Sequence, residues 1–329
     1  MRFRTTLSSY QANWQIDHSS SVCLLGSCFA TSIGEKFAKA KIKTLSNPWG
    51  TIYHPTPLLS LVKSAINNDP PNKNGYVKSN GRILHYGTHS DIHAHTQLEF
   101  VERFTSVNVH FIAHIRQSQC LFITLGTAWH FYHTDLDLVV SNCHKQPNNQ
   151  FERRISSTNA LEADIGEIVN LLQKINPSLQ IILTVSPVRH ERDGLIANNR
   201  SKAHLIAACH EICESWDSVH YFPAYELLID DLRDYRYYDD DLVHPSSQAV
   251  HYIWQYLVKH HTLPTTQDLI SSAERISKDL SHRTIQPESE QHRTFLLKLI
   301  DKMNKLQENG LDYEEEISMI KLRLGNLST

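Results

Sequence analysis

Short apolar runs alternate with amphipathic segments through most of the 329-residue chain. The runs are typical of buried strands, and the segments after them repeat their apolar positions at helical spacing, as Phe29, Ile33, Phe37 and Ala40 do. The alternation predicts an α/β fold, a three-layer αβα arrangement with helices on both faces of a central parallel sheet. The predicted strands are 21–25, 120–126, 180–188 and 219–223, and the predicted helices are 29–40, 159–177, 201–216 and 246–261.

Beyond His261 the pattern changes, because only helical periodicity remains. We therefore predict an α/β domain over 1–264 and a helical appendage over 265–329, packed on the domain or used in self-association. Residues 70–100 are irregular and rich in histidine, and we expect an insertion or a long surface loop there. In the appendage, one predicted helix has an apolar face made of Leu296, Leu299, Met303 and Leu306, and Asn309–Gly310 is a helix-ending pair. Asp312 can then cap a last helix with Ile317, Ile320 and Leu324 on one side.

Composition narrows the class of protein. A formal net charge of −3 disfavours a nucleic-acid binder, which usually carries a basic face. No apolar run approaches the roughly 20 residues of a membrane span, and the first residues carry no apolar signal core. The six cysteines show no paired spacing, so we expect reduced thiols. We further expect a cytoplasmic protein, and we expect no cofactor.

The stretch "LLGSCF" places two candidate nucleophiles side by side, Ser27 and Cys28. A strand that turns through Gly-Ser into a helix presents the Ser27 hydroxyl at the sheet edge and leaves its N–H free to hold an oxyanion. The alternative is an ordinary N-capping serine. A thiol at Cys28 would gain acidity from the helix N-terminus, but this position favours packing into the core.

A second motif, "DDDLVHPSS", places Asp241 three residues before His244 and just ahead of a helix. One turn of chain can bring the carboxylate to the imidazole Nδ1, which fixes the tautomer and leaves Nε2 free as a base. The alternative is a solvated acidic turn followed by a helix-start histidine.

Glycines at predicted strand ends supply further candidates. Gly126 in "FITLGTAW" and Gly50 in "SNPWG" could direct main-chain N–H groups at a substrate, although each could also be a simple turn residue. Arg189 and His190 follow the strand at 180–188 and are candidate substrate contacts. Their alternative is an exposed loop pair.

The order of these motifs resembles the SGNH (GDSL-type) hydrolase superfamily, and in particular its GSCFA family. The blocks are "LLGSCFA", "NPWGTIYHP", "TLGTAW", "TVSPVRH…DG…N…SK", "YFPAYELLIDDLRDYR" and "DLVHPS", which span about Val22 to His261. The resemblance implies an SGNH-hydrolase (flavodoxin-like) fold, with Ser27 as nucleophile and His244 and Asp241 as base and acid. It further implies that Gly50 faces an oxyanion and that Gly126 holds the third-block position.

The chain departs from that pattern in the third block. The superfamily has an oxyanion-donating Asn where this chain has Ala128, and losing one such donor costs about 2.7–4 kcal/mol. The candidate replacements are Asn47, Thr127, Trp129 Nε1 and His130. Asn47 is preferred, because it lies three residues before Gly50.

The resemblance implies a hydrolase, and by analogy with related chemistry one that removes a short acyl group, such as O-acetyl, from a carbohydrate-type ester. The same three side chains would serve an O-acyltransferase, and the missing Asn keeps a non-catalytic binding scaffold as a further alternative. The expected partner is the small-molecule or carbohydrate ester. We expect no nucleic acid and no membrane, with a homo-oligomer possible through the C-terminal helices.

A metal site is the remaining alternative, because the chain has 21 histidines and "HYGTHSDIHAH" gathers several of them. Gly87 disfavours the helix that would bring His85 and His89 together, and no recognised zinc framework is present. We therefore predict a solvated or substrate-facing loop and no metal. The residues concerned are His85, His89, Asp91, His93 and His95.

Overall fold

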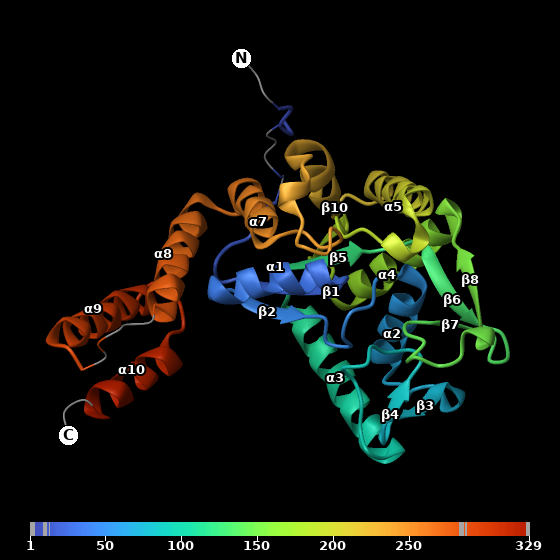
Figure 1. Cartoon of the computed structure of the whole chain (residues 1–329), viewed down its shortest axis with the longest axis horizontal. Helices are drawn as coiled ribbons and strands as arrows, with labels where there is room; N and C mark the ends of the chain where they lie inside the picture. The colour runs from blue at the N-terminus through green and yellow to red at the C-terminus, as the bar shows by residue number, and fades with distance from the viewer. Residues whose placement is uncertain (1–3, 9–11, 13, 283–285, 287, 327–329) are drawn as a thin grey trace.

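The computed structural model describes the chain except residues 1–3, 9–11, 13, 283–285, 287 and 327–329 (Figure 1). Its centre is a five-stranded parallel sheet in the order β10-β9-β5-β1-β2. Counted within this sheet alone, the order is the 2-1-3-4-5 of flavodoxin-like folds, as predicted. The strands are β1 (Ser21–Gly26), β2 (Lys43–Ser46), β5 (Cys120–Leu125), β9 (Gln180–Val185) and β10 (Val219–Tyr221).

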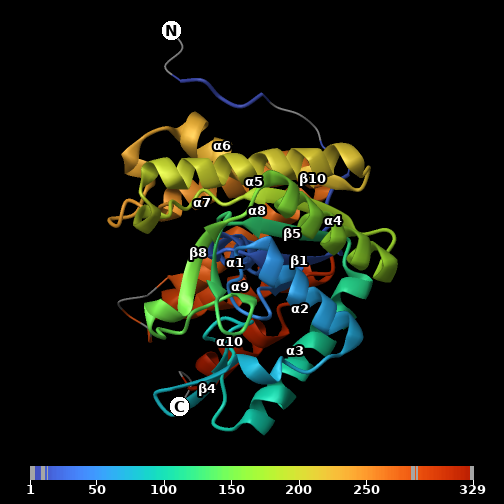
Figure 2. The ribbon, with the colours of Figure 1, turned by 90° about the vertical axis from the view of Figure 1, so that its right-hand side faces the viewer.

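Helices cover both faces of the sheet (Figure 2). Because side chains alternate along a strand, Val22 and Leu24 of β1 pack with α1 (Cys28–Lys39) and α7 (Ser247–His261). Cys23 and Leu25 pack on the opposite face. That face is covered by α2 (Pro55–Asn67), α3 (Gln97–Gln117), α4 (Thr158–Ile175) and α5 (Leu195–Ser215).

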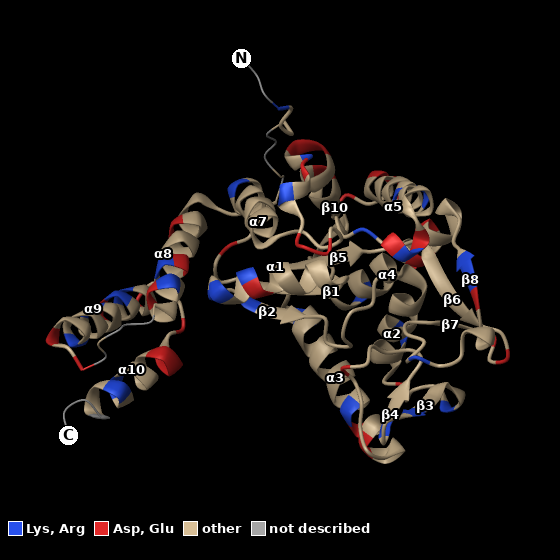
Figure 3. Ribbon diagram, in the orientation of Figure 1, with Lys and Arg blue, Asp and Glu red and all other residues tan. Residues whose placement is uncertain are grey.

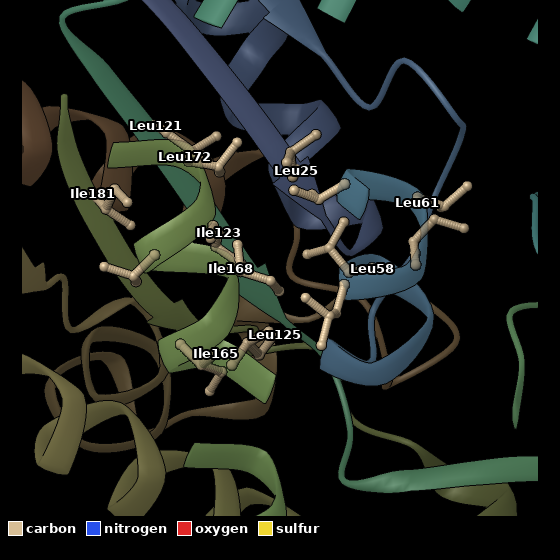
Figure 4. Close-up of a cluster of buried hydrophobic side chains, with 14 of the residues drawn as sticks. Leu25, Leu58, Leu61, Leu121, Ile123, Leu125, Ile165, Ile168, Leu172 and Ile181 are labelled. Atoms are coloured by element: carbon tan, nitrogen blue, oxygen red, sulfur yellow. The ribbon is translucent and has the colours of Figure 1, made fainter. Parts of the chain in front are cut away.

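The larger core lies under α2 and α4 (Figure 4). Leu25 and Ile123 from the sheet meet Leu58 from α2 and Ile165 from α4, and all four are essentially inaccessible to solvent. Each such side chain contributes about 1.5–3 kcal/mol on burial. This packing holds β1 and β5 rigidly, and their carboxyl ends carry the candidate site.

Two further β structures depart from the predicted organisation. Residues 70–100 are not irregular throughout, because β3 (Tyr76–Ser79) and β4 (Arg82–His85) form a hairpin. Its turn is Asn80–Gly81, and both residues have positive φ, as a tight hairpin requires. A three-stranded antiparallel sheet, β7-β6-β8, lies beside the main sheet: β6 (Trp129–His133), β7 (Leu138–Val140) and β8 (Phe151–Ile155).

The four helices predicted before His261 are confirmed with shifts at their ends, whereas α2 and α3 were not predicted. Ser246 caps α7, and its hydroxyl accepts the Ala249 N–H. The helix α5 begins at Leu195, six residues before the predicted start at Ser201. Short helical turns complete the fold: η1 (Lys73–Gly75), η2 (Asn148–Gln150), η3 (Glu191–Asp193), α6 (Ala224–Glu226), η4 (Leu227–Leu232) and η5 (Tyr235–Tyr237).

The chain after His261 is helical, as predicted, and forms α8 (Pro264–Ser281), α9 (Glu290–Gln307) and α10 (Glu314–Asn326). These helices share a hydrophobic cluster of their own and extend away from the sheet (Figure 1). A Lys41–Glu316 ion pair and a hydrogen bond from Trp254 Nε1 to Glu274 join them to the α/β part. None of the described helices combines the length and apolarity needed to cross a membrane.

Candidate active site

A cavity of about 670 Å³ opens at the carboxyl ends of the central strands. Of the predicted site residues, the cavity is lined by Ser27, Thr127, Trp129, Arg189, His190, Asp241 and His244. Its lining does not include Asn47, Gly50 or Gly126. Strand ends from both sheets and the loop before α7 therefore meet at this one cavity.

The turn between β1 and α1 presents the Ser27 hydroxyl. Gly26 has a φ of 123°, and a Cβ there would lie 2.1 Å from Thr124 O, so only glycine fits. Ser27 occupies the N-cap position of α1, yet its hydroxyl makes no capping hydrogen bond. Its Oγ is buried with no hydrogen-bond partner among the described residues. The hydroxyl is thus held for something other than capping.

Asp241 orients His244. The imidazole Nδ1 lies 2.6 Å from Asp241 Oδ2, while Asp241 Oδ1 accepts the N–H groups of Val243 and His244, each at 2.9 Å. These hydrogen bonds, first those with His244, lower the pKa of Asp241 to about 2. A proton on Nδ1 leaves Nε2 unprotonated, which is the form a general base needs. Ser27 Oγ and His244 line one cavity without a hydrogen bond between them, and such contacts often tighten only with substrate.

Cys28 lies closer to the chemistry than its predicted packing role implied. It is only partly buried and lines the same cavity as Ser27, while Cys23 is fully buried in the core. Burial raises the pKa of the Cys28 thiol. Because the thiolate is the nucleophilic form, a raised pKa disfavours Cys28 as the nucleophile.

The predicted oxyanion donors already have acceptors within the protein. The Ser27 N–H is not free, because it donates to Thr124 O at 2.9 Å, and the Gly50 N–H donates to Asn47 O at 2.8 Å. Trp129 Nε1 donates to Ala197 O at 3.2 Å. His130 lines the cavity, and its Nδ1 lies 3.2 Å from Ser156 Oγ.

Asn47 has a different task from the one expected of it. Its Oδ1 accepts the Gly26 N–H at 2.8 Å, and its Nδ2 donates to Thr31 Oγ1 at 2.9 Å and more weakly to Ser27 O at 3.3 Å. All of these bonds hold the turn that carries Ser27. Asn47 is therefore a clamp on the turn that carries Ser27.

We expect Asn47→Ala to lower the free energy of unfolding by about 1–3 kcal/mol, because it leaves the Gly26 N–H without its acceptor. Urea denaturation followed by circular dichroism measures this. Thr31→Ala is the matched control: it removes one partner of Asn47 but keeps the acceptor for Gly26, and should cost less. Equal stability of Asn47→Ala and the unmodified protein would contradict the clamp.

The loop after β5 is held by Ser201 and Lys202 of α5, which the sequence analysis included in a family block but to which it gave no role. The Ala128 N–H donates to Ser201 Oγ at 2.7 Å, and Lys202 Nζ donates to Gly126 O at 2.6 Å and Ser186 O at 2.7 Å. Lys202 is 1% exposed. The sequence offers a sign that this lysine is buried: it shares helical spacing with Leu205 and Cys209 and so lies on the apolar face of α5.

Charged and aromatic groups form the outer wall of the cavity. The Arg153 guanidinium lies 4.3 Å from the centre of the Trp129 ring and pairs with Asp193. The Arg189 guanidinium lies 5.0 Å from the centre of the Tyr238 ring, and the main-chain N–H of Arg189 donates to Val243 O, next to His244 in the chain. Burial, with Lys202 and Arg153 nearby, lowers the pKa of His190 to about 4, so its ring is neutral at pH 7.

The histidines of the segment 85–95 do not converge on one point, because each bonds to a partner of its own. His85 Nε2 bonds to Asn72 O, His89 pairs with Asp91, and His93 Nδ1 bonds to Ser90 O. Within the described part of the chain, no group of three or more His, Cys, Asp or Glu residues is placed to hold a metal ion. Acidic and basic residues are interspersed along the ribbon (Figure 3).

Fold and site together define an α/β protein with a serine and an Asp-oriented histidine in one cavity at the carboxyl edge of its sheet. The model of the GSCFA family matches residues 21–257, and that of the GSCFA domain protein C-terminal domain matches residues 273–326. The chain therefore belongs to the GSCFA family.

Solved structures with a similar arrangement include two family 3 carbohydrate esterases. The one from Talaromyces cellulolyticus is 9% identical and the one from Clostridium thermocellum 11%, each with a TM-score of 0.35 over 77% of this chain and 98% of the other. A mutant acetyl esterase with an acetate ion is 10% identical, with a TM-score of 0.34 and the same coverage. No curated protein matches the sequence.

Proposed function

We propose that the protein is a serine ester hydrolase of the SGNH type. One observation carries the proposal: the buried, unpartnered Ser27 Oγ shares a cavity with His244, whose Nδ1 is bonded to Asp241. A buried hydroxyl without a partner is costly, and a catalytic role explains why it is kept. The motif order of the GSCFA family supports the same assignment.

In the proposed reaction, His244 Nε2 takes the Ser27 proton while Oγ attacks the ester carbonyl. The tetrahedral intermediate collapses, the C–O bond to the alcohol breaks, and His244 returns the proton to the leaving alcohol. Water, deprotonated by His244, then attacks the acyl-serine and releases the acid. Asp241 keeps the imidazole oriented and stabilises its charged form.

The proposed substrate is a short acyl ester on a carbohydrate-type alcohol. The cavity has far more room than an acetyl group needs, and its walls combine the aromatic Trp129 with the charged Arg153, Asp193 and Arg189. Aromatic faces and fixed polar groups suit a hydroxyl-rich ring. An activity panel of nitrophenyl acetate, butyrate and octanoate, together with acetylated xylan, tests this choice, and we expect acetyl esters to be hydrolysed fastest.

A serine-directed fluorophosphonate probe tests the nucleophile. We expect it to label the protein and Cys28→Ala, and to leave Ser27→Ala unlabelled and without esterase activity. Ser27→Ala and Cys28→Ala are matched, because each removes one heavy atom from adjacent residues of one turn. Persistent labelling of Ser27→Ala would refute the assignment of Ser27 as the nucleophile. Absence of both labelling and turnover in the unmodified protein would favour a binding scaffold.

A further inference from the structure

The proposed hydrolase needs a donor for its oxyanion, and the two amides expected to supply it are engaged elsewhere. The Ser27 N–H donates to Thr124 O and the Gly50 N–H to Asn47 O. The third-block position holds Ala128, whose side chain cannot donate and whose N–H goes to Ser201 Oγ. The donor must therefore come from another group that faces the cavity.

Thr127 has a main-chain N–H that remains available. The residue is 4% exposed and lines the same cavity as Ser27. Its hydroxyl is engaged, because it bonds to Ser201 Oγ at 2.9 Å and accepts the Trp129 N–H at 3.0 Å. No acceptor for the Thr127 N–H occurs among the residues that the structure describes. A buried amide without an acceptor is rare and calls for a ligand.

Lys202 acts on the same peptide unit from the other side. Its Nζ donates to Gly126 O at 2.6 Å, and the Gly126–Thr127 peptide is trans, so the Thr127 N–H points away from the lysine. A cation bonded to a carbonyl oxygen draws electron density through the amide and makes its N–H a stronger donor. The bond from Nζ to Ser186 O ties this unit to the end of β9.

The geometry points to the Thr127 main-chain N–H as the oxyanion donor of this site, with Lys202 as the positioning residue that orients and polarises it. The inference rests on the proposed esterase function. It explains why Ala128 is tolerated: the third block supplies a main-chain donor one residue earlier, in place of the missing Asn side chain.

The surroundings of Lys202 make its charge sensitive to pH. The groups that face it are Cys28 from α1, Asp193 from η3, the Tyr225 ring 6.0 Å away, and His190. No described carboxylate forms an ion pair with it. Burial lowers the pKa of Lys202 to about 7. The charged, polarising form is therefore lost as pH rises through about 7.

The direct test exchanges Thr127 for its α-hydroxy acid analogue by nonsense suppression, which replaces the N–H with oxygen and keeps the side chain. We expect kcat on nitrophenyl acetate to fall about 10²–10³-fold with little change in KM, as for other oxyanion donors. The same exchange at Trp129, whose N–H bonds within the loop, is the matched control and should cost less than about tenfold.

Lys202→Met supplies the second arm. In the unmodified enzyme we expect kcat to decline as pH rises above about 7, because Lys202 loses its charge there. In Lys202→Met we expect a lower kcat and no such decline, a change that loss of stability alone would not produce. Unchanged kcat in the Thr127 ester variant of an active enzyme would overturn the inference while the proposed function stands. An unmodified protein that neither labels at Ser27 nor turns over an ester would overturn both.

Discussion

Replacing His244 with alanine should lower kcat for ester hydrolysis by about 10³–10⁴-fold and leave the fold intact. The fold should survive because the imidazole is 49% exposed and its main partner is the equally exposed Asp241. Without the imidazole, nothing in the proposed reaction removes the Ser27 proton. Stopped assays on nitrophenyl acetate, with circular dichroism as the fold check, measure the effect.

Added imidazole sharpens this test. The alanine variant leaves a space at the mouth of the cavity, so millimolar imidazole should restore part of the rate in His244→Ala and none in Ser27→Ala. Asp241→Asn should also lower kcat, because it disturbs the tautomer, while Asp240→Asn changes an exposed neighbouring carboxylate and should leave kcat unchanged. A His244→Ala enzyme with full activity beside an inactive Ser27→Ala would mean that another residue is the base.

Gly26→Ala should destabilise the protein by about 4 kcal/mol or more, among the largest effects of a single substitution. A Cβ at this position would lie 2.1 Å from Thr124 O and 2.8 Å from Thr124 C, which are main-chain atoms of a central strand. They cannot move aside without breaking the pairing of β1 with β5. The φ of 123° adds strain for any L side chain. Urea denaturation measures the loss, and weak soluble expression would accompany it.

Gly81→Ala separates the two causes of that loss. Gly81 also has a positive φ, 74°, but a Cβ there meets nothing within 4 Å. The variant therefore carries only the conformational penalty, about 1–2 kcal/mol. A Gly26→Ala protein no less stable than Gly81→Ala would show that the turn can relax, and the fit of Gly26 against Thr124 would then not explain the position.

Most of the sheet and four of the helices that cover it could be predicted because their periodicities are local and strong, whereas α2 and α3 were missed. The run 21–25 is apolar at every position except its first, as a strand buried on both faces requires, and 159–177 repeats apolar positions at helical spacing. The strands β6, β7 and β8 were missed because they follow one another with no α-helix between them, whereas the equally short β10 continues the alternation of strand and helix. Their pairing depends on partners elsewhere in the chain, and an isolated short run does not reveal it.

In the candidate site too, contacts between residues close in the sequence could be predicted, and contacts between distant segments could not. Asp241 and His244 lie within one turn, so their spacing in the sequence nearly determines their contact. The acceptor of the Ser27 N–H could not be predicted from the sequence, because it is Thr124 on a neighbouring strand. The roles of Ser201 and Lys202 depend on how α5 packs behind the loop at Gly126, which is a property of the assembled fold.

The pairing of β1 with β5 also affects how the protein folds. These central neighbours are separated in the chain by α1, β2, α2, the β3–β4 hairpin and α3, so their contact closes a long loop. Contacts of this kind form slowly, because the chain entropy lost in closing the loop precedes any gain from packing. The Ser27 turn is bonded to Thr124 across that contact, so we expect the turn to take its shape only after β1 and β5 have paired.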